Sequence, residues 1–258
     1  MQADNFNLQD YFARIGYQGQ PSADIATLNA LMRCQLFSVP FENLDVQVGK
    51  VVSMVPEEIV EKIVYQWRGG YCYEVNGVFA MALQALGFDY QMVAARPMFY
   101  PVRRPKTHMA IVVNIGQQAW LCDLGFGSYG LRAPMSLSML DKEVIQDHDR
   151  FMLTTTDSGS FVLEAKVEGN WQQQFAFDLT PWEFIDFYPA NYMNSKHPES
   201  IFVQKLLVVL HTPTGRHILF GNTLKTITDG VVEKRILSAE ERSGALKTVF
   251  GLTIVDQD

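Results

Sequence analysis

The sequence predicts an α+β fold, with helices first, strands in the middle and a smaller mixed segment at the end. Apolar residues recur at helical spacing in the first 88 residues, whereas β-rich segments separated by turn residues dominate from Phe88 to about Tyr192. Beyond Tyr192, strand and helix patterns mix. The chain has 258 residues, 48% of them hydrophobic, which suffices for one large core or two smaller ones and is compatible with one to three domains.

Three helices are predicted in the first 88 residues. Ser22 and Asp24 offer N-terminal caps before a helix over residues 25–36, and Pro56 opens a second helix that runs through Trp67. A third helix stops at Gly87, and Cys72 lies in or just before its first turn. Its apolar residues follow the helical period at Val75, Val78, Phe79, Ala82, Leu83 and Leu86.

Strands are predicted where segments alternate or are rich in β-branched and aromatic residues. These segments are residues 90–95, 108–115, 119–124, 151–155, 161–167 and 171–177, followed by 206–210, 216–220, 223–228 and 231–236. Asp229-Gly230 is typical of a tight hairpin turn between the last two strands. Ser238 and Glu241 form a capping box, which predicts a final helix that ends near Gly251.

Cys72 has the position of a nucleophilic cysteine. It follows Gly69-Gly70 and opens the third helix, where unpaired backbone N–H groups and the positive end of the helix dipole favour a thiolate. A lone free cysteine is more often a small buried residue. The interpretation of Cys72 as a nucleophile therefore depends on partners elsewhere in the chain.

His108 and Asp123 are candidate partners, because they belong to two predicted strands around a short glycine turn. A two-residue loop at Gly116-Gln117 pairs Ala110 with Asp123 and leaves His108 diagonal to Asp123 on the same face, roughly 7–8 Å apart in backbone position. A two-residue loop at Ile115-Gly116 places the two residues directly opposite each other. An odd-numbered loop without a bulge would put them on different faces.

If His108 and Asp123 pair, the three residues have the logic of a catalytic triad. Asp123 would orient the imidazole, and His108 would take the proton of Cys72. The structural alternatives are a buried core histidine for His108 and a cap of the Gly125-Phe126-Gly127 turn for Asp123.

Several motifs of the chain resemble those of the arylamine N-acetyltransferase family. They are Arg68-Gly-Gly-Tyr-Cys72-x-Glu74-x-Asn76, Thr107-His108, Asp123-Leu-Gly-Phe-Gly127, Val39-Pro-Phe-Glu-Asn-Leu-Asp45 and Asn191-Tyr-Met-Asn-Ser195-Lys-His197-Pro198-Glu-Ser200-x-Phe202, which together span most of the chain. The resemblance implies a bacterial-type member, since the insert typical of animal relatives is missing between the second and third segments. The chain departs from many members of the family at Tyr71, where they have phenylalanine. A phenol beside the nucleophile would alter acceptor preference.

The resemblance implies acetyl transfer in a ping-pong reaction, typical of xenobiotic metabolism. Cys72 would be the acyl-accepting nucleophile, His108 its base and Asp123 the orienting residue. Acetyl-CoA would serve as co-substrate, with no permanently bound cofactor, and the acceptor would be a small arylamine or N-hydroxyarylamine. Three alternatives stay open: a Cys-His-Asp thioester or amide hydrolase, an amide synthase that takes its acyl group from a carrier protein, and a non-catalytic binding module.

The resemblance also implies residues around the reacting atoms. Phe126 would line the acceptor pocket, and Gly127 and Ser128 would approach the coenzyme phosphates, since glycine permits close backbone approach to an anion. Phe41 would line the amine pocket, or else be a core aromatic residue after Pro40.

The architecture implied by the resemblance has three parts with a cysteine-protease or transglutaminase-like core. A helical domain over residues 1–88 would carry the nucleophile, a β-barrel domain over 89–195 would carry the histidine and the aspartate, and an α/β lid would cover 196–258.

Composition excludes other classes. A net charge of −7 argues against nucleic-acid binding, and no apolar run approaches the ~18 residues of a membrane span. Three cysteines without a secretory signal favour a reducing cytoplasm, and no close cysteine or histidine pair indicates a metal site. The one basic run, Arg103-Arg104-Pro105-Lys106, is either a solvated loop or a contact for coenzyme phosphates.

Overall fold

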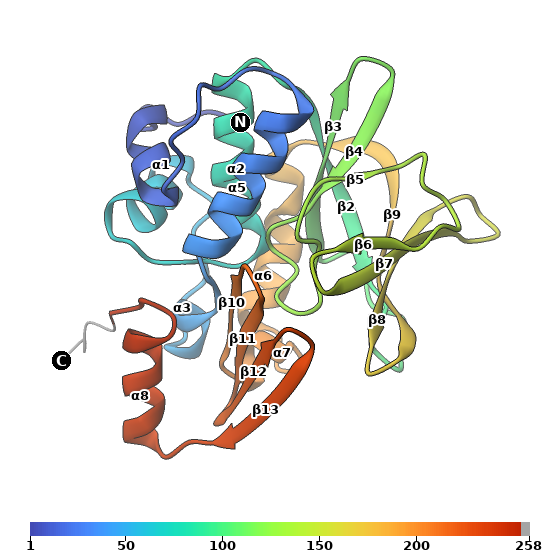
Figure 1. Ribbon diagram of the computed structural model, residues 1–258. Helices are drawn as coiled ribbons and strands as arrows, with labels where there is room; N and C mark the ends of the chain where they lie inside the picture. The colour runs from blue at the N-terminus through green and yellow to red at the C-terminus, as the bar shows by residue number, and fades with distance from the viewer. Residues whose placement is uncertain (254–258) are drawn as a thin grey trace.

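A computed structural model of the protein describes residues 1–253. Helices come first along the chain, a curled sheet of eight strands follows, and a smaller sheet with one covering helix comes last (Figure 1). The mixed α and β composition and the order of elements agree with the predicted fold class.

The helices largely follow the predicted pattern. α2 (Ile25–Ser38) begins after Asp24, whose side chain accepts a hydrogen bond from Thr27 N, and α5 (Cys72–Ala85) has Cys72 as its first residue, within the predicted first turn. The predicted helix from Pro56 to Trp67 is broken. The remaining helices of the described chain are α1 (Leu8–Ile15), α3 (Leu44–Gln47), α4 (Pro56–Val60), the π-helical turn η1 (Glu61–Tyr65), the 3₁₀ turn η2 (Phe184–Phe187), α6 (Tyr188–Lys196), α7 (Ile201–Gln204) and α8 (Ala239–Thr248).

The break in the second helix has a local cause. Residues 56–60 are α-helical, residues 61–65 widen into a π-helical turn, and Trp67 adopts a left-handed φ of 55°. A bulky residue adopts this conformation only where surrounding structure holds it. Gly69 and Gly70 follow this turn and precede Cys72.

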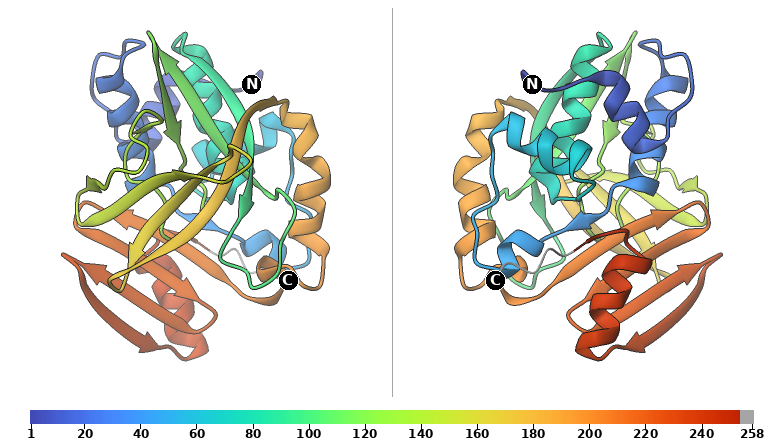
Figure 2. Two further views of the ribbon diagram at one scale, coloured as in Figure 1. Left: turned by 90° about the vertical axis from the view of Figure 1, so that its right-hand side faces the viewer. Right: turned by 90° about the vertical axis from the view of Figure 1, so that its left-hand side faces the viewer.

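The large sheet is antiparallel throughout, with the order β5-β4-β3-β2-β9-β8-β7-β6. It curls into a half-barrel whose two edges are β5 and β6 (Figure 2). Its strands are β2 (Asp89–Pro97), β3 (His108–Ile115), β4 (Gln118–Cys122), β5 (Met135–Ser136), β6 (Val144–Gln146), β7 (Asp149–Thr155), β8 (Phe161–Val167) and β9 (Asn170–Trp182).

The small sheet pairs a short strand from the helical first part of the chain with the last four strands. Its order is β1-β10-β11-β12-β13, and α8 packs against it. The hairpin turn at Asp229-Gly230 has positive φ at both residues, as predicted, and Ser238 caps α8. Its strands are β1 (Phe41–Glu42), β10 (Leu207–Thr212), β11 (Gly215–Phe220), β12 (Thr223–Thr228) and β13 (Val231–Ile236).

One hydrophobic core lies between the helices and the concave sheet. It includes Leu28 and Leu31 of α2, Phe79 of α5, and Ile111 and Phe175 of the large sheet. α5 packs directly against β2 and β3, which places its first residue beside the start of β3. This contact positions the candidate site.

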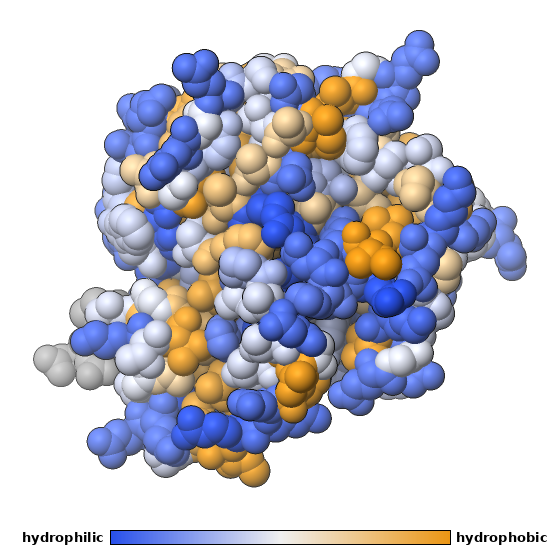
Figure 3. All heavy atoms as spheres, viewed as in Figure 1, coloured by the Kyte–Doolittle hydropathy of each residue, from blue (hydrophilic) through white to orange (hydrophobic). Residues whose placement is uncertain are grey.

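The outer surface is mostly hydrophilic. On the face seen in Figure 3, apolar side chains form small separate patches among polar ones. Among residues 1–253, none of the helices combines the length and hydropathy needed to cross a bilayer.

Candidate active site

The start of α5 is held by two glycines that permit close packing. A Cβ on Gly69 would lie 2.0 Å from the Pro40 carbonyl oxygen, and a Cβ on Gly70 would lie 2.6 Å from the Glu74 side chain. Glu74 reaches back so that its Oε2 accepts the Tyr71 N–H at 3.0 Å. Cys72 is thus fixed as the first residue of the helix, where backbone N–H groups lack intrahelical acceptors.

A largely buried cluster of charged side chains lies next to this turn and includes Glu74. The Lys62 ammonium lies 2.6 Å from Asp45 and 2.7 Å from Glu74, and the Arg68 guanidinium lies 2.7 Å from Glu42. Burial lowers the pKa of Lys62, but the surrounding carboxylates outweigh it and raise that pKa. The motif around Glu42 and the motif around Cys72 are therefore parts of one ionic network.

His108 and Asp123 meet as the first of the two hairpin registers predicts. Ile115 pairs with Gln118 and Ile111 with Cys122, which leaves Gly116-Gln117 as the two-residue loop. The His108 Nε2 atom lies 2.8 Å from Asp123 Oδ2, and both side chains are buried. The other ring nitrogen, Nδ1, does not take part in this contact, and the Cys72 thiol lies next to the ring.

Asn76 joins the helix to both strands. Its Nδ2 group donates to Met109 O at 2.7 Å and to Asp123 Oδ1 at 3.1 Å, while its Oδ1 accepts Leu124 N at 2.9 Å. The sequence alone predicted no role for Asn76. Its spacing of four from Cys72, on the same helix face, was the available signal.

The environment of His108 favours the charged imidazole. Burial lowers the pKa of His108, but the Asp123 carboxylate and the adjacent Cys72 thiol outweigh it and raise that pKa to about 10. The ring also packs against Phe126 at 5.3 Å and Phe175 at 5.0 Å between centroids. These rings exclude water and fix the orientation of the imidazole.

The turn after Asp123 lies directly on Cys72. A Cβ on Gly125 would sit 2.5 Å from Cys72 Cα, and one on Gly127 would sit 2.6 Å from the Phe41 ring. The Gly125 N–H donates to Asp123 Oδ1 at 2.9 Å. Glycine at these two positions lets the turn close over the thiol.

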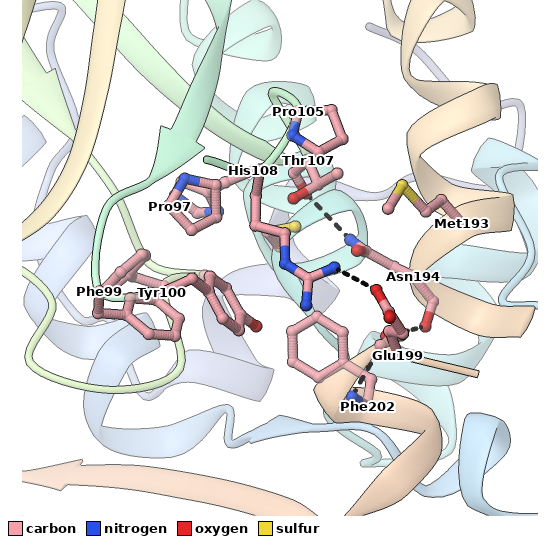
Figure 4. Close-up of a pocket in the computed structure, with 15 residues that line it drawn as sticks. Pro97, Phe99, Tyr100, Pro105, Thr107, His108, Met193, Asn194, Glu199 and Phe202 are labelled. Atoms are coloured by element: carbon pink, nitrogen blue, oxygen red, sulfur yellow. Dashed lines mark hydrogen bonds and ion pairs between the residues drawn. The ribbon is translucent and has the colours of Figure 1, made fainter. Parts of the chain in front are cut away.

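Cys72 and His108 open into a single cavity of about 60 Å³ (Figure 4). Its lining combines aromatic and polar side chains. The lining consists of Cys72, Pro97, Phe99, Tyr100, Arg104, Pro105, Thr107, His108, Gly125, Phe126, Met193, Asn194, Glu199, Ser200 and Phe202.

The other predicted site residues lie near this cavity but are not part of its lining. Phe41 and Gly127 line a small neighbouring cavity that Phe126 shares. Ser128 is held by its carbonyl oxygen, which accepts a hydrogen bond from Arg216 at 2.8 Å. The structure therefore brings Cys72, His108, Asp123 and Phe126 together and leaves Phe41, Gly127 and Ser128 in the adjoining shell.

Tyr71 does not face the cavity. Its ring is fully buried, and its hydroxyl group lies 3.0 Å from Ser195 Oγ and donates to the Asn191 side chain in α6. The expected influence of this phenol on acceptor preference is not supported by its position. Tyr71 instead anchors α6, which supplies Met193 and Asn194 to the lining.

The other cysteines have no comparable surroundings. Burial raises the pKa of Cys34 and, more strongly, that of Cys122. All three cysteines of the chain lie in the described part and are free. Within residues 1–253, no group of three or more histidine, cysteine, aspartate or glutamate side chains is arranged to hold a metal ion.

Comparison with known proteins finds relatives that match nearly the whole chain. Residues 24–258 match the family model described as N-acetyltransferase. The chain is 33% identical over 254 residues to the arylamine N-acetyltransferase of Escherichia coli strain K12, covering 96% of this chain and 90% of that one. It is 32% identical over 222 residues to the arylamine N-acetyltransferase / N-hydroxyarylamine O-acetyltransferase of Salmonella typhimurium, covering 83% and 76%.

Among solved structures, the arylamine N-acetyltransferase of Mycobacterium marinum in complex with CoA superposes with a TM-score of 0.90 at 29% identity. The match covers 95% of this chain and 92% of that one. Sequence and structure thus agree over nearly the whole chain, which belongs to the arylamine N-acetyltransferase family.

Proposed function

We propose that the chain transfers an acetyl group from acetyl-CoA to an aromatic amine or N-hydroxyarylamine through an acetyl-cysteine at Cys72. One observation carries the proposal: a cysteine at a helix N-terminus shares a cavity with a histidine whose far nitrogen is held by a buried aspartate. The names of the relatives and the CoA bound in the Mycobacterium marinum structure support the donor and acceptor classes.

The first half-reaction loads Cys72. His108 Nδ1 takes the Sγ proton, and the thiolate attacks the thioester carbonyl carbon. The N–H groups of the first turn of α5 stabilise the negative oxygen that forms. When the tetrahedral intermediate collapses, the carbon–sulfur bond to coenzyme A breaks and His108 returns its proton to the departing thiolate.

The second half-reaction unloads Cys72. The nitrogen of an arylamine, or the oxygen of an N-hydroxyarylamine, attacks the acetyl carbonyl and gives its proton to His108 Nδ1. Cys72 then leaves as a thiolate beside the protonated imidazole. The Asp123 carboxylate stabilises the imidazolium of this ion pair, which is why the pKa of His108 is raised.

The surrounding residues have supporting roles in this proposal. Phe126 packs against His108 and lines the cavity, so it would hold the acceptor ring. Gly127 and Ser128 would approach the coenzyme phosphates, and Phe41 would hold the Gly127 backbone in place. No permanently bound cofactor enters the scheme.

The proposed organisation keeps three segments, 1–88, 89–195 and 196–258. The first supplies Cys72, the second His108 and Asp123, and the third would act as a lid. Free thiols at all three cysteines agree with a reducing cytoplasm.

Intact mass spectrometry after incubation with acetyl-CoA tests the reaction. One added acetyl group is expected in the wild type, absent in Cys72→Ala and lost when an arylamine is added. Cys34→Ala is the matched control and should be acetylated normally. Acetyl-CoA consumption without amine would indicate a hydrolase, and failure to react with free acetyl-CoA would indicate a carrier-dependent synthase.

A further inference from the structure

The segment between β4 and β5 connects the wall of the cavity to the small sheet. Gly125 and Phe126 line the cavity, and Phe126 packs against His108. Within residues 1–253, residues 126–131 form no backbone–backbone hydrogen bond and belong to no helix or strand. Irregular backbone without such bonds does not fix its own position, so side chains from other elements must place this segment.

The two hydrogen bonds that reach residues 126–131 in the described chain both come from the small sheet. Arg216 of β11 donates through NH1 to the Ser128 carbonyl oxygen at 2.8 Å. Lys225 of β12 donates through Nζ to the Tyr129 hydroxyl group at 2.6 Å. Both cations also pack over the Tyr129 ring, at 5.1 Å from its centroid for Arg216 and 5.3 Å for Lys225. Such cation–π contacts reinforce the two hydrogen bonds.

Arg216 is the more deeply buried of the two anchors. Its side chain is 0% exposed, against 16% for Lys225, and its NH2 group donates to Asp149 at the start of β7. Arg216 thus joins the small sheet, the segment and the large sheet at one point. Its buried Nε has no hydrogen-bond acceptor within residues 1–253. A buried guanidinium with an unused donor costs free energy, so stability alone does not account for an arginine here.

The Ser128 carbonyl group is only two residues away from Phe126. A displacement of Ser128 therefore moves the Phe126 ring, which packs against Phe99, His108 and Phe175. His108 itself would keep its place, because its hydrogen bond to Asp123 involves no residue of the segment. Loss of the anchor should change the wall of the cavity while the activation of Cys72 stays nearly intact.

We propose that Arg216 is a positioning residue, which holds the Ser128 carbonyl group and the Tyr129 ring so that Phe126 stays packed against His108. The inference rests on the proposed acetyl transfer. It adds a residue that acts through residues 126–129 and does not touch the reacting atoms. Because Arg216 belongs to β11, the small sheet then takes part in the second half-reaction through this one contact.

The rate at which acetyl-Cys72 passes its acetyl group to aniline tests the proposal. Cys72 is loaded with 4-nitrophenyl acetate, and loss of the acetyl group is followed by intact mass, against a sample without aniline. In Arg216→Met this rate should fall about ten- to a hundredfold, as for a small misplacement of a positioning group. Asp149 keeps a cation in this variant, because Arg132 NH1 lies 3.6 Å from it.

Alkylation of Cys72 by iodoacetamide at pH 6 is the second readout, because it reports the activated thiol and not the wall of the cavity. In Arg216→Met, we expect this rate to change by less than about threefold, since the contact between His108 and Asp123 remains. A general loss of structure would lower both rates together. The two readouts therefore separate positioning of the segment from support of the fold.

Variants of Tyr129 perturb the same segment with less risk to the fold, because Tyr129 is only half-buried. Tyr129→Ala should slow transfer to aniline about tenfold, whereas Tyr129→Phe keeps the ring and should keep most of the rate. The double variant of Arg216→Met and Tyr129→Ala should be no slower than the slower single variant, because both act through one segment. Arg33→Met is the matched control and should match the wild type, because Arg33 pairs with Asp147 and, in the described chain, forms no hydrogen bond with residues 126–131.

Wild-type rates of transfer in Arg216→Met and Tyr129→Ala would overturn the inference alone, and if Arg216→Met does not fold, Tyr129→Ala decides. Equal losses of transfer and alkylation would also overturn it, since Arg216 would then support the fold as a whole. So would additive losses in the double variant, which would mean separate routes. A wild type that forms no acetyl-Cys72, or does not pass the acetyl group to aniline, would refute the proposed function, and the inference with it.

Discussion

Replacing Asp123 with asparagine tests what holds His108 in its active state. The carboxylate bonds to His108 Nε2 at 2.8 Å through Oδ2, and accepts Asn76 Nδ2 at 3.1 Å and Gly125 N at 2.9 Å through Oδ1. An asparagine amide has one acceptor oxygen and one NH₂ group. In one orientation the NH₂ group faces His108, and in the other it faces the two donors, Asn76 Nδ2 and Gly125 N.

Both orientations damage the triad. If the NH₂ group faces His108, the ring must accept at Nε2 and carry its proton on Nδ1, so it cannot take the proton of Cys72. If the oxygen faces His108, donors oppose each other at Asn76 and Gly125, and a neutral group replaces the charge that stabilises the imidazolium.

The magnitude follows from the pKa of His108. That pKa is about 10, against an ordinary value of 6.5, which corresponds to on the order of 5 kcal/mol in favour of the charged ring. Most of this preference comes from Asp123, so we expect kcat to fall about 10³- to 10⁴-fold. A serine-protease triad loses ~10⁴-fold on the equivalent change.

The assay combines steady-state acetyl transfer with the rate of Cys72 alkylation by iodoacetamide at pH 6. Asp89→Asn is the matched control, because Asp89 is an exposed aspartate of the same sheet that bonds to Asn114 at 3.0 Å. A loss below about tenfold in a folded Asp123→Asn protein would refute the reasoning, since an orienting carboxylate is worth far more.

The ion pair between His108 and Asp123 also predicts that the stability of the fold depends on pH. Because the folded pKa of His108 is raised, its pairing with Asp123 stabilises the fold fully below pH 6.5, and this contribution is lost as the pH rises through about 10. The difference in unfolding free energy between wild type and Asp123→Asn should therefore narrow between these values. A constant difference in urea denaturation would contradict the assignment.

Two further substitutions probe the support of the site. Gly125→Ala would place a methyl group 2.5 Å from Cys72 Cα, so we expect the turn to shift, with at least a hundredfold loss of kcat and about 1–3 kcal/mol of stability. Gly244→Ala is the control, because a Cβ on Gly244 in α8 would meet no atom within 4 Å. Lys62→Met leaves the Asp45 and Glu74 carboxylates without their ammonium partner. We expect this to lower the free energy of unfolding at pH 7 by about 3–5 kcal/mol, as measured by urea denaturation. Since burial raises the pKa of Glu74 to about 7, this loss should shrink at pH 5, where the carboxylates can take up protons; an equal loss at both pH values would exclude the charge explanation.

Local sequence determined the elements that present the reacting groups. The helix after Gly69-Gly70 and the Asp229-Gly230 turn depend on residues a few positions apart, and both form as predicted. The loop at Gly116-Gln117 is one of the two registers that the sequence allowed. Strand parity then put His108 and Asp123 on one face. The choice between the two hairpin registers was beyond sequence, because both satisfy the same alternation.

Elements without strong periodicity escaped prediction. α6 is largely polar, and its buried residues are Asn191, Asn194 and Ser195, which bond to Val52, Tyr71 and Thr107. Such a helix is stabilised by its partners rather than by an apolar face. α1 did carry a readable signal, since Asn7 caps its start and Gly16 ends it in a left-handed conformation.

The sequence by itself thus determined the family, the order of elements and the candidates Cys72, His108 and Asp123. Only the tertiary structure decided that Asn76 bridges helix and sheet, that Tyr71 faces away from the cavity and that Arg104 faces into it. The physical reason is that periodicity and capping act within a few residues, whereas these contacts join segments far apart in the chain. Their geometry is fixed by close packing of the whole core, which no local pattern records.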